Sequence, residues 1–140
     1  MPVEEGGRRR AVFTAQAPPP VGPYSQAIRA GGFIFVAGQI ALDPATGQMV
    51  EGPADVQARR VLENLKAVLA ACGAQMSDVV KTTVFLRNMA DFAAVNRVYE
   101  EYFPQPPPAR SAVAVAELPR GALVEIEAVA LDPAQAGQGG

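Results

Sequence analysis

The chain has 140 residues, of which 49% are hydrophobic and 19% are charged, and its formal net charge is −2 at pH 7. This length suits one domain with a full hydrophobic core, and this composition excludes a disordered chain. The slightly acidic balance excludes a general attraction to nucleic acid or to an anionic membrane. No run approaches the roughly 18 consecutive apolar residues of a membrane-spanning helix.

The residue counts also exclude several classes of chemistry. The chain has no histidine and one cysteine. Ser-His-Asp and Cys-His catalysis need an imidazole, and metal sites built on histidines or on several thiolates need ligands that this chain lacks. We therefore expect no metal centre of these kinds, and any reaction has to use carboxylates, Lys, Arg, Tyr, hydroxyls, backbone groups and water.

We expect an N-terminal extension over residues 1–16 that includes a short strand, "AVFTAQ". A double arginine, as in Arg8–Arg10, can suggest an export signal, but "TAQAPPPVGP" follows where an apolar segment would be needed. A solvated tail that leads into a strand is the better interpretation. The lone Cys72 cannot form an internal disulfide, which is compatible with the reducing cytoplasm where we expect the protein.

A stiff connection, "PPPVGPYS", leads into a predicted hairpin of residues 25–29 and 33–40, with its turn at 30–32. Both faces of the second strand are apolar. Gly38 interrupts this strand, which indicates a bulge or a close approach of the backbone to a ligand, although glycine also occurs in strands without either role. A loop with turn residues, 42–52, follows.

From Pro53 to Gly73 the apolar residues recur at the period of a helix, with Pro and Gly where a helix starts and stops. Cys72 ends the apolar stripe, so we interpret it as a core residue rather than a nucleophile. The β-branched segment 79–87 predicts a strand, and 91–103 predicts a second amphipathic helix that Pro104 ends. The last two strands, 111–118 and 123–131, are predicted as a hairpin joined by "PRGA", and 132–140 as a mobile tail.

These elements give an α+β plan with six strands in one sheet and two helices. Two helices cover one face of such a sheet only, yet the strands carry apolar residues on both faces. An uncovered apolar face marks an association surface. We therefore expect the second face to be buried by symmetric self-association.

Two charged residues stand out in the last third of the chain. Arg110 follows the rigid Pro106–Pro108 run, and it is either a surface side chain satisfied by water or a guanidinium that holds a small carboxylate in a cleft. Glu125 lies on the face assigned to association, where it either forms a partly buried salt bridge, for example with Arg110, or orients a water beside a substrate. Glu127 has the same chemical capacity, and periodicity does not choose between them.

Two further polar residues are candidates for a pocket. Tyr24 follows a Gly-Pro turn, where its ring either caps a pocket or packs locally on the loop. Asn96 lies on the inward side of the second helix, so its amide is either a structural link or a polar group of a pocket.

The segments "GPYSQAI", "FIFVAGQIALDPATG", "NLKAVLAACGA", "VVKTTVFLRNMADFAAVN", "YEEYFP" and "PPARSAVAVAELPRGALVEIEAVAL" together resemble the reactive intermediate deaminase family, RidA/YjgF, over residues 17–131. The resemblance implies one domain over that range, a chorismate-mutase-like fold with a mixed sheet, and a homotrimer with sites in the clefts between subunits. It also implies hydrolysis of reactive 2-imino acids to 2-keto acids and ammonia without a cofactor.

Carried over by position, the resemblance makes Arg110 the anchor of the substrate carboxylate and Glu125, not Glu127, the residue that orients water. It places Tyr24, Gly38 and Asn96 in the substrate pocket. Two positions depart from the family. Many relatives have Ser where this chain has Ala37, and many have Cys where it has Ala112, which puts substrate preference and rate in question.

Two other functions remain open at the level of the sequence. The same clefts or the trimer surface fit a sensor of small carboxylates or a chaperone-like assembly that performs no reaction. An older name of the family invokes an endoribonuclease and translation inhibitor, but RNA affinity requires a basic face, and the only basic run, Arg8–Arg10, lies in the extension.

Overall fold

The computed structural model describes residues 8–134, so the outer parts of the predicted extension and tail lie outside the described residues. Its strands and helices follow the predicted order: β1 (Arg10–Val12), β2 (Ala27–Ala30), β3 (Phe33–Gln39), α2 (Ala54–Ala71), β4 (Val79–Leu86), α3 (Phe92–Tyr102), β5 (Ala109–Ala114) and β6 (Val124–Leu131). Three short 3-10 turns, η1 (Met76–Asp78), η2 (Met89–Asp91) and η3 (Pro119–Gly121), connect them.

The strands form one six-stranded sheet in the order β1-β2-β3-β6-β4-β5. The pair β4–β5 is parallel, and the other neighbouring strands are antiparallel, so the sheet is mixed as expected. The predicted hairpin of β2 and β3 is confirmed, with Ala30 opposite Phe33. β1 is shorter than predicted because the side chain of Gln26 accepts a hydrogen bond from the backbone N–H of Thr14 at 2.7 Å and draws the chain out of the sheet.

The predicted hairpin of the last two strands is wrong. β6 lies between β3 and β4 in the sheet, whereas β5 lies at the edge, parallel to β4. The helix α3 carries the chain from β4 back to the start of β5, which is the crossover that a parallel pair requires. Burial explains the placement: alternate residues of β6 are buried, from Val124 to Ala130, whereas β5 is mostly exposed and suits an edge.

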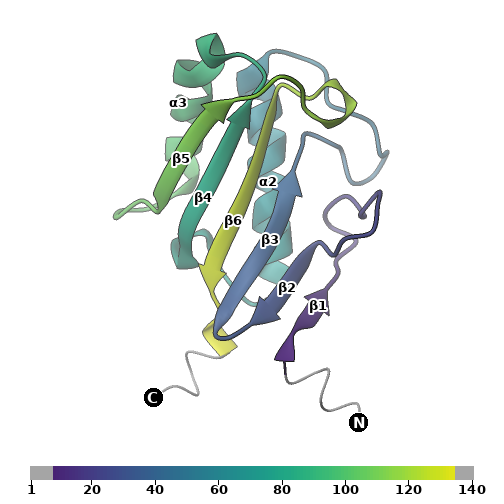
Figure 1. The fold of residues 1–140 in the computed structure, drawn as a ribbon, viewed down its shortest axis with the longest axis vertical. Helices are drawn as coiled ribbons and strands as arrows, with labels where there is room; N and C mark the ends of the chain where they lie inside the picture. Colours follow the sequence, from purple (N-terminus) through teal and green to yellow (C-terminus); the bar gives the residue numbers. More distant parts are fainter. Residues whose placement is uncertain (1–7, 135–140) are drawn as a thin grey trace.

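Both helices cover the same face of the sheet (Figure 1). The predicted stripe of α2 is buried in the core, and it consists of Val61, Leu65, Val68, Leu69 and Cys72. These side chains pack against the buried faces of β3, β4 and β6, which include Ile34, Val84 and Ile126. The helix ends before Gly73, whose φ of +78° is a conformation that glycine adopts without strain.

The opposite face of the sheet has no helix over it (Figure 1). Phe33, Phe35 and Leu131 alternate with buried residues, and they are 39%, 46% and 45% exposed. Bulky apolar side chains on three neighbouring positions of one sheet face are costly to leave in water. The prediction that the helices leave one apolar face uncovered is therefore confirmed for this chain.

A buried ion pair ties the ends of several elements together. Arg29 on β2 lies with its Nε 3.2 Å from Oδ2 of Asp132, which follows β6 and is almost fully buried. The same guanidinium donates a hydrogen bond to the carbonyl of Cys72 at the end of α2. These contacts fix the end of α2 against the end of the sheet.

Candidate functional site

Gly38 and Glu125 meet where β3 and β6 lose their regular register. The pairing of these strands shifts between Val36 and Gln39, so the predicted bulge is present. A Cβ at position 38 would lie 2.2 Å from Oε2 of Glu125, closer than any real contact. The group that lies close to the backbone at Gly38 is therefore the side chain of Glu125 rather than a ligand. Because glycine has no Cβ, the carboxylate of Glu125 fits beside it.

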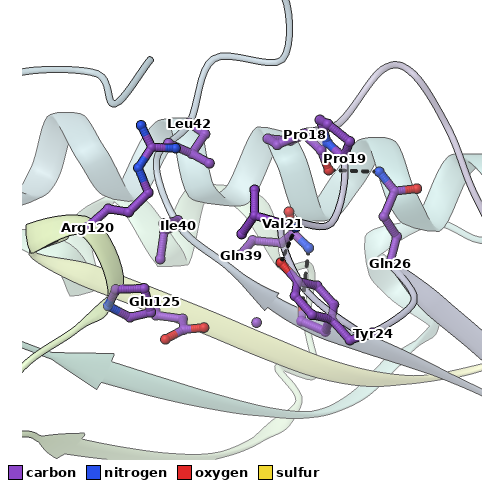
Figure 2. Close-up of a pocket in the computed structure, with 13 residues that line it drawn as sticks. Pro18, Pro19, Val21, Tyr24, Gln26, Gln39, Ile40, Leu42, Arg120 and Glu125 are labelled. Atoms are coloured by element: carbon purple, nitrogen blue, oxygen red, sulfur yellow. Dashed lines mark hydrogen bonds between the residues drawn. The ribbon is translucent and has the colours of Figure 1, made fainter. Parts of the chain in front are cut away.

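The carboxylate of Glu125 opens into a cavity of about 320 Å³ (Figure 2). This is near the lower end of the range of small-molecule sites, about 300–1,000 Å³. The walls are mostly apolar, and their apolar side chains are those of Pro18, Pro19, Val21, Ala37, Ile40, Leu42 and Pro119. The polar side chains that line the cavity are those of Tyr24, Gln26, Gln39, Arg120 and Glu125.

Tyr24 comes from the proline-rich loop before β2. Its ring lines the cavity, and its hydroxyl oxygen accepts a hydrogen bond from the N–H of Val21 at 3.4 Å, so the ring both packs on its loop and faces the cavity. The buried Gln26 fastens this loop, since its Nε2 donates to the carbonyl of Pro18 at 2.9 Å (Figure 2). The loop is thus held against the sheet by side-chain hydrogen bonds to its backbone.

Glu125 has an unusual electrostatic environment for a carboxylate. Burial raises its pKa first, and the like charge of Glu127 on the same face raises it further. Glu127 itself is exposed and does not line this cavity. Of the two glutamates, Glu125 is the one whose proton affinity and position suit exchange of a proton inside a cavity.

Arg110 lies at the start of β5, and its side chain packs against α3. Its Nη1 donates to Oδ1 of Asn96 at 2.6 Å, and its guanidinium carbon lies 4.8 Å from the ring centre of Tyr99 and 5.4 Å from that of Phe92. These contacts hold the guanidinium although the residue is exposed. Arg110 and Asn96 also line a second hollow, of about 480 Å³, together with Tyr99 and Pro107.

Tyr99 of α3 supports Arg110, and no pattern in the sequence marks it for this role. Its hydroxyl forms a 2.7 Å hydrogen bond with the hydroxyl of Thr82, which is fully buried on β4. Burial raises the pKa of Tyr99, so the hydroxyl stays protonated and the ring stays fixed under the guanidinium.

Within one chain, Arg110 and Glu125 lie on opposite faces of the sheet. Arg110 pairs in register with Thr82, whose side chain is buried under the helices. Glu125 pairs with Phe85, which is three positions further along β4 and therefore on the other face. Neither residue takes part in the two ion pairs found within residues 8–134, so the alternative in which Glu125 pairs with Arg110 does not occur within one chain.

The structure thus brings Tyr24, Gly38 and Glu125 together in one cavity, and it brings Arg110 and Asn96 together in another. Gln39 and Arg120, which line the first cavity, were not predicted as site residues. Ala37 lines that cavity with a methyl group, whereas Ala112 is partly buried against the core on β5. Gln39 is buried although alternation with Ile34 and Val36 would place it on the other face, because the bulge shifts the register, and no pattern in the sequence marks this.

No group of three His, Cys, Asp or Glu side chains between residues 8 and 134 is placed to hold a metal ion. Over the same range, no helix combines the length and the apolar composition required to cross a bilayer.

Comparison with known proteins places this chain in a family. Residues 14–132 match the family model described as Endoribonuclease L-PSP. A RutC family protein of Pyrococcus horikoshii is 55% identical over 122 residues, which cover 87% of this chain and 97% of the relative. A protein of Dermatophagoides farinae named 2-iminobutanoate/2-iminopropanoate deaminase is 50% identical over 121 residues, which cover 86% of this chain and 94% of the relative.

A solved structure, that of E. coli TdcF with bound serine, superimposes with a TM-score of 0.83. It is 40% identical to this chain, and the match covers 87% of this chain and 98% of TdcF. Sequence and structure thus agree over nearly the whole length of these relatives, and the chain belongs to the RidA/YjgF family, whose family model is described as Endoribonuclease L-PSP.

Proposed function

We propose that this protein hydrolyses small 2-imino acids to 2-keto acids and ammonia. The observation that carries the proposal is the carboxylate of Glu125, half-buried with a raised pKa in a small cavity that Gly38 keeps open for it. Relatives about 50% identical to this chain carry the name of such a deaminase, and one solved relative holds serine, a small amino acid.

The complete site takes Arg110 from one copy of the chain and Glu125 from another. One chain presents the two residues on opposite sides of its sheet, so a small substrate does not reach both of them in the same copy. The uncovered face around Phe35 and Leu131 supports an assembly in which copies bury that face against each other. We propose the trimer that the family resemblance implies, with a site at each boundary between copies.

The reaction requires little from the protein because a protonated imine is already electrophilic. Arg110 binds the carboxylate of the imino acid through N–H groups that do not bond Asn96. Glu125 accepts a hydrogen bond from a water molecule and takes its proton as the oxygen adds to the imine carbon. The proton then passes to the nitrogen of the carbinolamine. The C–N bond breaks as Glu125 takes the proton of the hydroxyl group, and the 2-keto acid and ammonia leave, with the ammonia accepting that proton as ammonium.

Placement of the reactants supplies most of the acceleration in this scheme. Holding a water and an imine in contact contributes up to about 7–11 kcal/mol in the best oriented systems. The apolar walls formed by Pro18, Ile40 and Leu42 restrict bulk water near the reacting carbon. No group in the scheme forms a covalent intermediate, which suits a chain without histidine.

The direct test is the release of keto acid from a freshly generated imino acid, with and without the protein. We expect wild-type protein to accelerate the release and Arg110→Ala to lose at least about tenfold in kcat/KM, because a charge-assisted bond contributes about 1.5–3 kcal/mol. Arg97→Ala, which removes an exposed arginine of α3, is the matched control and stays near wild type. Equal rates for wild type and Arg110→Ala would contradict the assignment of Arg110.

One observation favours a second candidate, a module that binds small carboxylates without reaction. Ala37 contributes only a methyl group to the cavity, so no hydroxyl from that position contacts a water or a substrate. In this case the protein binds 2-keto acids but the release of keto acid from imines proceeds at the uncatalysed rate. The same assay therefore separates the two candidates.

A further inference from the structure

Arg120 has a backbone conformation that is unusual for its residue type. Its φ and ψ are 57° and 25°, and it is the one residue other than glycine with positive φ within residues 8–134. A side chain with a Cβ is strained in this left-handed region, whereas glycine adopts it freely, as the next residue, Gly121, does with φ of 72°. Strained residues of this kind concentrate at functional sites.

The strained turn places Arg120 in the wall of the cavity that holds Glu125. It is the only basic residue among those that line this cavity. In Figure 2, Arg120 and Glu125 lie on the same side of the cavity, opposite Tyr24, and the guanidinium extends toward Leu42 while the carboxylate points the other way. The cavity wall thus contains one carboxylate, that of Glu125, and one guanidinium, that of Arg120, which lie apart from each other.

The guanidinium of Arg120 has few partners of its own. It donates one long hydrogen bond, of 3.5 Å, to the carbonyl of Gly47, and neither ion pair in the described part of the chain includes it. A bond of this length is weak. Its remaining N–H groups point to no carboxylate of the described chain, so a ligand with an anionic group is the partner that they fit.

We propose that Arg120 binds a second carboxylate, on the side chain of the substrate, and so directs the site toward imino acids with acidic side chains. This inference rests on the proposed function, in which Arg110 of a neighbouring copy holds the first carboxylate. Without Arg120, a dianionic substrate would meet the negative charge of Glu125 with no compensating charge in this wall. With Arg120, the second carboxylate gains a charge-assisted bond at a distance from the reacting carbon.

The test compares two imino acids of equal chain length, those generated by an oxidase from glutamate and from 2-aminopentanoate. The readout is the ratio of their kcat/KM values after subtraction of the uncatalysed rate. Because a hydrogen bond to a charged group is worth about 10- to 100-fold in binding, Arg120→Gln lowers this ratio about tenfold or more. Arg87→Gln, which removes an exposed arginine outside the cavity, leaves the ratio unchanged.

Arg120→Gly separates the role in binding from a role in folding. Glycine relieves the strain at this position, so this variant has a thermal midpoint equal to or above that of wild type and yet loses the same preference for the acidic substrate. An unchanged ratio in both variants overturns the proposal. So does an equal loss on both substrates, because that result indicates general attraction of anions rather than recognition of the side chain.

Calorimetric titration with the stable products, 2-oxoglutarate and 2-oxopentanoate, distinguishes failure of this inference from failure of the proposed function. Wild type binds 2-oxoglutarate more tightly, and Arg120→Gln reduces this preference about tenfold or more. If imine hydrolysis is not accelerated but this preference is present, the inference stands and the deaminase assignment fails. If hydrolysis is accelerated but the two keto acids bind equally, the inference fails alone.

Discussion

At the scale of single residues, the contact of Gly38 with Glu125 decides where the carboxylate lies. An alanine at position 38 would place its Cβ 2.2 Å from Oε2 and 2.9 Å from Cδ of Glu125. These atoms belong to the end of a flexible side chain, which is able to move away without disturbing the backbone. The glycine therefore matters to the position of the carboxylate more than to the stability of the fold.

We expect Gly38→Ala to reduce the accelerated rate of keto-acid release at least about tenfold, as misplacement of a reacting group does. Its thermal midpoint should fall only a little, because Gly38 has no left-handed φ and the clash is with a movable group. Gly22→Ala, whose new Cβ meets only ordinary contacts with the ring of Tyr24 at 3.7 Å, is the control. A large loss of stability without loss of activity in the folded fraction would refute this account.

The raised pKa of Glu125 predicts a particular dependence on pH. If the ionised carboxylate takes the proton from water, the accelerated rate falls as the pH drops through the pKa of Glu125, which burial and Glu127 raise above the ordinary value of a glutamate. Glu127→Gln removes a like charge and so lowers the pKa of Glu125, which moves the acid limb of the profile to lower pH. A profile that stays in place, or moves to higher pH, is the contrary result.

At the scale of elements, α3 and β4 act together as the support of Arg110. The ring of Tyr99 lies under the guanidinium, and the buried hydroxyl of Thr82 holds the ring. A contact between a cation and a ring contributes about 0.5–1 kcal/mol at an exposed site, or roughly two- to fivefold in binding. The hydrogen bond to Thr82 acts mainly on stability, because its loss leaves a buried hydroxyl without a partner.

Two substitutions at position 99 separate these contributions. Tyr99→Leu removes the ring, and we expect KM to rise about two- to fivefold with a smaller effect on kcat. Tyr99→Phe keeps the ring but leaves Thr82 without its partner, so unfolding becomes easier by about 1–3 kcal/mol while KM stays near wild type. Thr82→Val removes the same bond from the other side and serves as the control. If Tyr99→Phe and Tyr99→Leu raise KM equally, the ring is not the support.

The elements were predictable from the sequence where local patterns determine them. The period of α2, the stop at Gly73 and the hairpin of β2 and β3 all depend on nearby residues, and they are as expected. The pairing of β5 and β6 was not predictable in this way, because "PRGA" resembles a hairpin turn while burial separates the two strands in the sheet. The left-handed Arg120 also escapes prediction, since an arginine gives no sign of positive φ.

The same long-range pairing decides where the candidate site residues lie. In a hairpin, Arg110 and Glu125 would come from adjacent strands. With β4 between β5 and β6, the two side chains lie on opposite faces of the sheet. Arg110 and Glu125 are candidates that the family resemblance suggests, and their separation follows from long-range pairing that no local pattern reveals.

At the scale of the whole molecule, one proposal, a symmetric assembly, accounts for two features: the uncovered apolar face of the sheet, and the placement of Arg110 and Glu125 on opposite faces. An assembly that buries Phe33, Phe35 and Leu131 removes apolar side chains from water. Because each is already more than half buried, its further burial contributes roughly half of the about 1.5–3 kcal/mol that burying a fully exposed side chain does. We propose that the same assembly brings the cavity of one copy to Arg110 of the next. Closed symmetry then gives every copy an equal site.

Complementation between two defective variants tests this shared site most directly. As pure proteins, Arg110→Ala and Glu125→Gln are each expected to keep no more than about a tenth of the wild-type rate. When they are unfolded together in equal amounts and refolded, about a quarter of the boundaries in a cyclic assembly join an intact Arg110 to an intact Glu125. We predict recovery of about a quarter of the wild-type rate in this mixture. If mixed assemblies form and no activity returns, the two residues do not act across a boundary between copies, and the account is wrong.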